Sequence, residues 1–116
     1  MDVRSRKRIS RQDSEPQDNW QWVELHGVNP NDQGWLFGRK ADWIAFETYK
    51  SFIIVDKQKL IKFIRESIDT TSLVLSPGEA KYRVYSRNNR FDAITLVETE
   101  KLNQIAEETW DKLWDN

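Results

Sequence analysis

The sequence predicts an α/β (α+β) domain in which a mixed, largely antiparallel sheet carries two packed helices. Two stretches, residues 41–55 and 81–97, alternate in polarity and are rich in β-branched and aromatic residues, as strands are. Each runs directly into a segment whose apolar residues recur at helical spacing. The chain has 116 residues, of which 38% are hydrophobic, and this length and composition are typical of one folded domain. We therefore divide it into a basic arm with a polar loop, residues 1–19, and a single α/β domain, residues 20–116.

The first part of the domain is predicted to begin with a strand over residues 20–25. This segment contains two tryptophans and alternates in polarity, with a slip in phase at Val23. Gly, Asn-Pro and Asn-Asp then predict a turn over residues 27–33. A short apolar piece bounded by glycines follows at residues 34–38.

Two hairpins are predicted in the rest of the chain. Residues 41–48 and 52–55 form the first, with a turn at 49–51, and its second strand is apolar on both faces, as a central strand is. Residues 81–97 form the second hairpin, with an asparagine-rich turn at 87–90.

One amphipathic helix is predicted after each hairpin, beginning at a polar residue that can cap its first turn. Asp56 caps the first helix and Thr99 caps the second. The first helix has apolar residues at helical spacing, which are Leu60, Phe63, Ile64 and Ile68. The second has Leu102, Ile105 and Ala106, and its stripe continues with Trp110, Leu113 and Trp114. The tryptophans of this acidic tail are expected either to pack on the sheet or to bind a partner.

The two strand–helix junctions share one pattern. Residues 55–60 and residues 97–102 both contain a Val that ends a strand, a polar cap and a first buried Leu five positions after the Val. We interpret this as one supersecondary arrangement used twice, by convergence or by duplication.

Composition excludes several classes of site. The chain has no Cys and a single histidine, His26, so disulfides, thiolate nucleophiles and multi-histidine metal centres are excluded. Its apolar runs are too short to span a membrane, and the basic N-terminus lacks the apolar stretch of a signal peptide. We therefore expect no membrane partner and a location in the cytoplasm or nucleoplasm.

Charge is distributed unevenly along the chain, although the net charge is only −1. The C-terminal end is acidic, whereas the N-terminal arm carries five cations, which are Arg4, Arg6, Lys7, Arg8 and Arg11. We expect this arm, as an edge strand or a frayed segment outside the core, to bind phosphates of nucleic acid weakly and without sequence specificity. The alternative is a solubilising tail. A second basic and aromatic cluster, residues 81–90, is either a base-stacking surface or a solvated hairpin face.

Four short segments carry a resemblance to a known family. They are DVRSRKR at residues 2–8, WVEL at 22–25, GWLFG at 34–38 and KADWIAFE at 40–47. This order of segments resembles the latter part of small restriction-endonuclease-like proteins of the PD-(D/E)XK class, found in phages and other viruses. The resemblance covers roughly residues 2–60 and implies a nuclease-like fold.

In that class, two carboxylates hold a magnesium ion that activates water for attack on a phosphate, and a lysine follows the second carboxylate. Here Asp2 matches a metal-binding and catalytic carboxylate, whereas Arg4 stands in place of the lysine. Because only Met1 precedes Asp2, we expect a truncated or partner-dependent relative that does not cut DNA alone, with Mg²⁺ as cofactor only if active.

The leading functional hypothesis is therefore a nuclease-like, nucleic-acid-binding protein. The alternative is a catalytically inert protein-interaction factor, such as a small viral inhibitor or an accessory subunit. Self-association is expected in addition, because a nuclease-like sheet without its first elements exposes a strand edge. Glu24 and Asp42 are weighed as further functional carboxylates, while His26 is expected to be a surface residue.

Overall fold

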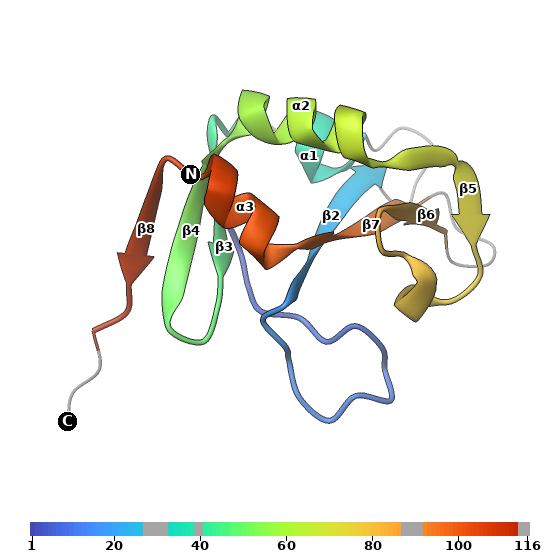
Figure 1. The fold of residues 1–116 in the computed structure, drawn as a ribbon, viewed down its shortest axis with the longest axis horizontal. Helices are drawn as coiled ribbons and strands as arrows, with labels where there is room; N and C mark the ends of the chain where they lie inside the picture. Colours follow the sequence, from blue (N-terminus) through green and yellow to red (C-terminus); the bar gives the residue numbers. More distant parts are fainter. Residues whose placement is uncertain (27–32, 39–40, 87–91, 114–116) are drawn as a thin grey trace.

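The computed structural model describes residues 1–26, 33–38, 41–86 and 92–113. Within these residues it contains two four-stranded mixed sheets and three α-helices (Figure 1). The α+β class is therefore confirmed. The predicted turns at residues 27–33 and 87–90 lie outside the described residues, apart from Gln33.

The first sheet has the strand order β1-β3-β4-β8. It consists of β1 (Asp2–Arg4), β3 (Trp43–Glu47), β4 (Ser51–Asp56) and β8 (Glu108–Asp111). Strand β1 pairs with β3 in parallel, and the other two pairs are antiparallel. The first predicted hairpin is confirmed as β3 and β4, and β4 is a central strand as expected. The start of the basic arm is an edge strand.

The second sheet has the strand order β2-β7-β6-β5. It consists of β2 (Trp20–His26), β7 (Ala93–Glu98), β6 (Arg83–Tyr85) and β5 (Asp69–Val74). Strands β5 and β6 are parallel, and the other pairs are antiparallel. The second predicted hairpin is confirmed as β6 and β7.

The prediction of a single sheet is wrong, because the strands divide into two sheets that share one core. Both sheets contribute fully buried residues to it, which include Val23 and Val97 of the second sheet and Ile44, Phe46 and Val55 of the first. Alternation within a strand indicates which of its faces is apolar, but it does not specify which other strand completes the backbone hydrogen bonds. Those pairings bring together segments far apart in sequence.

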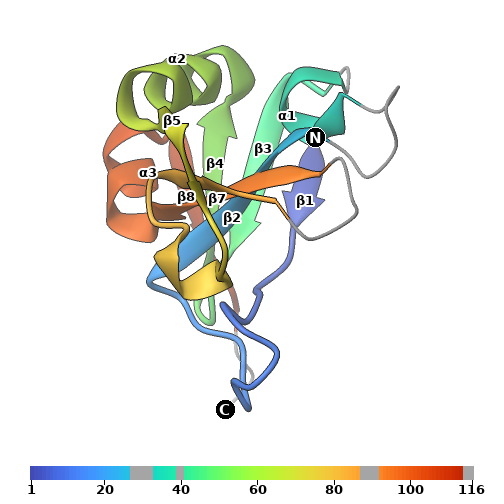
Figure 2. The ribbon, with the colours of Figure 1, turned by 90° about the vertical axis from the view of Figure 1, so that its right-hand side faces the viewer.

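Three helices complete the core: α1 (Gly34–Gly38), α2 (Lys57–Ser67) and α3 (Thr99–Ile105). Figure 2 shows α2 and α3 on one side of the molecule and α1 with β1 on the other. Helix α2 begins as predicted, since the Asp56 carboxylate accepts a hydrogen bond from the backbone N–H of Lys59 at 3.1 Å. No helix in the described part of the chain is long and apolar enough to cross a bilayer.

Helix α3 begins one residue earlier than predicted. Glu98 is its N-cap, without a side-chain capping bond, and Thr99 is its first residue. The Thr99 hydroxyl instead donates to the backbone carbonyl of Asp18, and its N–H donates to the Asn19 carbonyl at 2.9 Å. The Thr99 hydroxyl therefore does not cap the helix and instead joins the loop before β2 to the start of α3.

The predicted continuation of this helix through Trp110 and Leu113 is wrong. Helix α3 ends at Ile105, and Glu108–Asp111 forms strand β8, which pairs with β4. The free edge of β4 would otherwise leave its backbone groups unpaired, and β8 supplies partners for them. Trp110 is 50% exposed on this edge strand, and Trp114 lies outside the described residues.

The two strand–helix junctions have the same backbone geometry. Asp56 has φ −63° and ψ 130°, and Glu98 has φ −69° and ψ 130°. Leu60 and Leu102, the first core residues of the two helices, are both completely buried. The arrangement used twice is therefore confirmed as a local structure.

Candidate functional site

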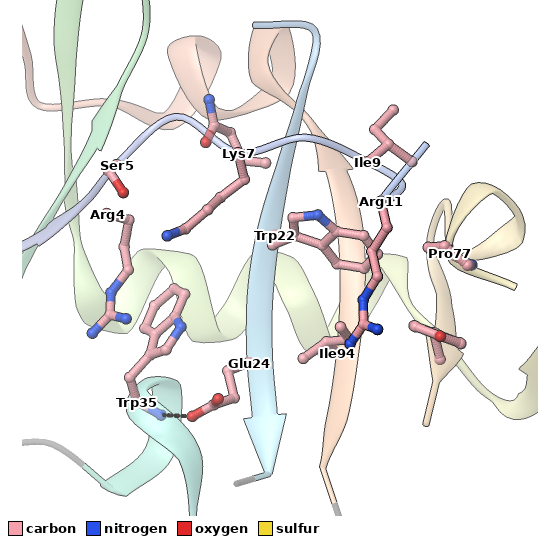
Figure 3. Close-up of a pocket in the computed structure, with 12 residues that line it drawn as sticks. Arg4, Ser5, Lys7, Ile9, Arg11, Trp22, Glu24, Trp35, Pro77 and Ile94 are labelled. Atoms are coloured by element: carbon pink, nitrogen blue, oxygen red, sulfur yellow. Dashed lines mark hydrogen bonds between the residues drawn. The ribbon is translucent and has the colours of Figure 1, made fainter. Parts of the chain in front are cut away.

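The segment after β1 crosses the outer face of the second sheet (Figure 3). We call residues 5–11 the strap. The indole N–H of Trp22 donates to the Arg8 carbonyl at 3.0 Å, and the backbone N–H of Gln17 donates to the Lys7 carbonyl at 3.2 Å. Arg6 donates from Nε to the carboxylate of Asp18 at 2.7 Å. These bonds fix the strap to β2 and to the loop that precedes it, so it is part of the fold and no free arm.

A groove of about 480 Å³ lies between the strap, β2, β7, α1 and the 3₁₀ turn Pro77–Glu79. The side chains of the strap and of the two strands converge on it (Figure 3). Its charged lining residues are Arg4, Lys7, Arg11 and Glu24, and its aromatic ones are Trp22, Trp35 and Tyr85. Cations and rings therefore meet in one hollow.

The five predicted nucleic-acid-binding cations are divided by the structure into two groups. Arg4, Lys7 and Arg11 line the groove. Arg6 is bound to Asp18, and Arg8 donates from Nη1 to two backbone carbonyls of the strap and its loop. Arg6 and Arg8 therefore hold the strap together, whereas the other three face the hollow.

Arg4 is the most constrained of the three cations. Its guanidinium forms an ion pair with the Asp2 carboxylate and lies 4.6 Å from the centre of the buried Trp35 ring. Its buried Nε has no hydrogen-bond partner among the described residues. Much of the charge of Arg4 is thus compensated, and Lys7 and Arg11 remain exposed.

Glu24 holds helix α1 against the groove. Its carboxylate accepts a hydrogen bond from the backbone N–H of Trp35 at 3.1 Å, in the first turn of α1. A carboxylate is favoured there because the first N–H groups of a helix lack partners within the helix. Glu24 therefore has a positioning role at the end of the groove that also holds Arg4.

The floor of the groove is aromatic and apolar at its other end. The Trp22 and Tyr85 rings lie 6.4 Å apart with an interplanar angle of 41°. Ile9 of the strap packs on the same small core cluster as these two rings, and Ile94 and Pro77 line the hollow beside them. Trp22 lies centrally in the close-up, between Lys7 and Arg11 (Figure 3).

The second basic and aromatic cluster, residues 81–90, is also divided between the groove and contacts elsewhere in the fold. Only Tyr85 of its described members lines the groove. The Lys81 ammonium lies 4.8 Å from the Trp20 ring centre, and the Tyr82 ring packs between Trp20 and Phe63. The other members at residues 87–90 lie outside the described part of the chain.

The donor set around Asp2 does not fit a magnesium site. Its carboxylate is bound to Arg4, and the described residues contain no group of three or more His, Asp or Glu side chains placed to hold a metal.

The other two residues weighed from the sequence, Asp42 and His26, do not line the groove. The backbone carbonyl of Asp42 accepts a hydrogen bond from the N–H of Lys57, the first residue of α2, at 2.9 Å. His26 ends strand β2 and is half-buried.

Sequence reasoning missed Trp22, Trp35 and Ile94 as groove residues. The signal for Trp22 was present, because Trp20, Trp22 and Glu24 share one face of β2 by strict alternation. The opposite face is Gln21, Val23 and Leu25, so the predicted phase slip at Val23 is wrong. Gln21 hid the alternation of β2 in the sequence, because it is a polar residue that faces the core. Its side-chain amide donates to the Glu47 carbonyl in a long hydrogen bond of 3.4 Å.

Glu47, the last residue of β3, connects the strap to the C-terminal segment. One carboxylate oxygen accepts from Nζ of Lys112 at 2.7 Å, and the other accepts from the backbone N–H of Arg6 at 3.1 Å. The hydrogen bond from Lys112 and then that from Arg6 lower the pKa of Glu47 below its usual 4.5. The ionised form is therefore more stable in the folded chain than in the unfolded one.

We expect Glu47→Gln to lower the free energy of unfolding at neutral pH by about 1–2 kcal/mol. Because the folded pKa of Glu47 is lowered, its stabilising contribution is present above pH 4.5 and is lost as the pH falls through the folded pKa. The difference between wild type and variant should therefore become smaller in acid. Urea unfolding at neutral pH and near pH 3 measures it, with exposed Glu66→Gln as the matched control. An equal difference at both pH values would contradict this account.

Comparisons with models of protein families, with curated proteins and with solved structures found no match to this chain.

Proposed function

We propose that this chain binds nucleic acid through the groove under the strap. One observation carries the proposal: Lys7 and Arg11 lie on either side of the partly buried Trp22 in a single hollow. Cations neutralise phosphates and release counterions, while an aromatic ring offers a face to a base. An intracellular location, expected from the sequence, is part of this proposal.

The binding is proposed to be weak and to lack sequence specificity. Phosphate contacts by flexible cationic side chains carry no base information. The chain as a whole has a net charge of −1, and its C-terminal elements are rich in carboxylates. We therefore expect dissociation constants in the micromolar range or weaker near physiological salt.

The decisive variant is Lys7→Gln/Arg11→Gln. Fluorescence anisotropy would follow a labelled hairpin with a single-stranded tail over a series of salt concentrations. The wild type should bind with an affinity that falls as salt rises, and the variant should lose about 1.5 units of the log–log slope. Both side chains are exposed, so circular dichroism should show an unchanged fold.

Lys62→Gln/Lys101→Gln is the matched control, since it removes the same charge from exposed positions on α2 and α3. If this control weakens binding as much as the groove variant does, the effect is one of net charge and the groove proposal fails. It fails equally if the wild type does not bind the tailed hairpin at low salt. The relation to PD-(D/E)XK nucleases stays a prediction, and the proposed function is binding without cleavage.

A protein-interaction factor is the second candidate, favoured by the outer face of the first sheet. Trp43 pairs with Asp56, and Trp110 pairs with Phe52, which places both tryptophans on the face opposite the core residues Ile53 and Val55. Trp43 is 39% exposed and Trp110 50% exposed. If the tailed hairpin is not bound, this candidate takes first place.

A further inference from the structure

The groove is concave, and the strap restricts its opening. The hydrogen bond from the Trp22 indole to the Arg8 carbonyl places the strap directly over one edge of the ring. A volume of about 480 Å³ lies in the range of pockets that enclose small molecules. A duplex is read by a protein element that enters one of its grooves. This hollow instead admits a group that projects from the nucleic acid.

A ligand can stack on the floor of the groove only with a ring whose face is uncovered. Trp22, Tyr85 and Ile94 line the groove there with apolar surface, and the two rings are tilted by 41° relative to each other. In a duplex, neighbouring bases cover both faces of each base, so only an unpaired base can stack on a protein ring. The chemistry of the floor therefore favours a single strand.

The charges indicate where the backbone of such a strand would lie. At one end of the groove, Arg4 is paired with Asp2, and the Glu24 carboxylate lies beside Trp35. Lys7 and Arg11 make no ion pair within the described residues. Phosphates are therefore favoured at the Lys7 ammonium, which points toward the Trp35 end of the groove, and at the Arg11 guanidinium on the other side of Trp22, and they are disfavoured next to the Glu24 carboxylate.

We infer that the groove binds single-stranded nucleic acid, with an unpaired base stacked on Trp22 and flanking phosphates on Lys7 and Arg11. This inference rests on the proposed function and narrows its ligand class from nucleic acid in general to unpaired strands. Stacking on a ring accepts every base, so the preference is for strandedness and only weakly for sequence.

Three ligands test the inference on the wild-type protein. They are a short labelled single strand, the same strand with abasic positions at its centre, and the same strand in a duplex. Anisotropy at low salt should show the single strand bound roughly tenfold tighter than the abasic strand, which has the same phosphates without the central bases. The duplex should be bound roughly tenfold more weakly than the single strand.

Two variants of Trp22 separate the contribution of its aromatic face to binding from that of its hydrogen bond to the strap. Trp22→Phe and Trp22→Leu both lose the indole N–H that donates to Arg8, but only the first retains an aromatic face. We expect Trp22→Phe to keep most of the affinity for the single strand and Trp22→Leu to lose roughly tenfold. Trp22→Leu should bind the abasic strand as the wild type does.

The outcomes distinguish this inference from the proposed function on which it rests. Equal binding of duplex and single strand, or equal binding of the abasic and normal strands, overturns the single-strand inference and leaves nucleic-acid binding intact. Failure to bind any of the ligands, including the tailed hairpin, overturns the proposed function itself. The abasic comparison uses the wild-type protein, so the inference remains testable even if a Trp22 variant does not fold.

Discussion

Replacing Phe46 by alanine is expected to lower the free energy of unfolding by about 3–5 kcal/mol. Phe46 is completely buried at the centre of the first sheet. It pairs with Ile53 of β4 on one side and with Arg4 of β1 on the other, and its ring centre lies 6.1 Å from that of Trp35. The substitution leaves a cavity where β1, β3 and α1 meet.

Such a loss is a large part of the total stability of a domain of this size, which is about 5–15 kcal/mol. Urea unfolding followed by circular dichroism measures it. Phe37→Ala is the matched control, because Phe37 is 41% exposed on α1 and stacks only with Arg65 among the rings and cations described. We expect the control to cost about 1 kcal/mol or less. Similar losses for both variants would show that Phe46 does not lie in the main core.

Gly34→Ala should destabilise the protein by roughly 2–5 kcal/mol, for two reasons that add. Gly34 has φ +79°, a conformation that costs an L-residue with a side chain about 1–2 kcal/mol. A Cβ at this position would lie 2.9 Å from the backbone nitrogen of His26 and 3.1 Å from its Cα. Backbone atoms cannot move aside as a flexible side chain can, so the crowding adds roughly 1–3 kcal/mol.

Gly78→Ala is the control for this prediction. A Cβ on Gly78 meets nothing within 4 Å, and the residue does not have a positive φ. We expect this control to be neutral or slightly stabilising, since alanine restricts the unfolded chain. Thermal unfolding of the two variants compares them directly. If Gly34→Ala melts at the wild-type temperature, the close approach of α1 to the end of β2 is wrong.

The Gly34 substitution also tests how the groove is built. The N–H of Trp35, the next residue, donates to Glu24, and the Trp35 ring supports Arg4. A shift of α1 would move this end of the groove but leave Lys7, Trp22 and Arg11 in place. Gly34→Ala should therefore lower the free energy of unfolding substantially but change the affinity for nucleic acid little, if the ligand is held mainly by Lys7, Trp22 and Arg11.

The groove itself was not predictable from the sequence, although its cations were. Arg6 and Arg8 belong to the same basic run as Lys7 and Arg11. Which of these four faces a ligand depends on where Asp18, Trp22 and the backbone carbonyls of the loop lie. Their division into structural and groove-facing side chains is decided by contacts between the strap, β2 and the loop that joins them.

What the sequence determined by itself was local. The β3–β4 hairpin, the strand–helix junction at Asp56 and the repeat of that junction at Glu98 depend on residues a few positions apart. Alternation, turn residues and, at Asp56, a capping carboxylate are sufficient for such features, because their hydrogen bonds close within one turn or one hairpin.

The tertiary structure alone decided the pairings between distant segments. Strand β8 forms where a helical stripe was expected, because the open edge of β4 supplies backbone partners for Glu108–Asp111. Gln21 faces the core since Glu47 and Thr99 lie close enough to share its amide. In each case a backbone or side-chain polar group could form its hydrogen bonds in more than one way. Which hydrogen bonds form depends on a partner that lies tens of residues away in the sequence.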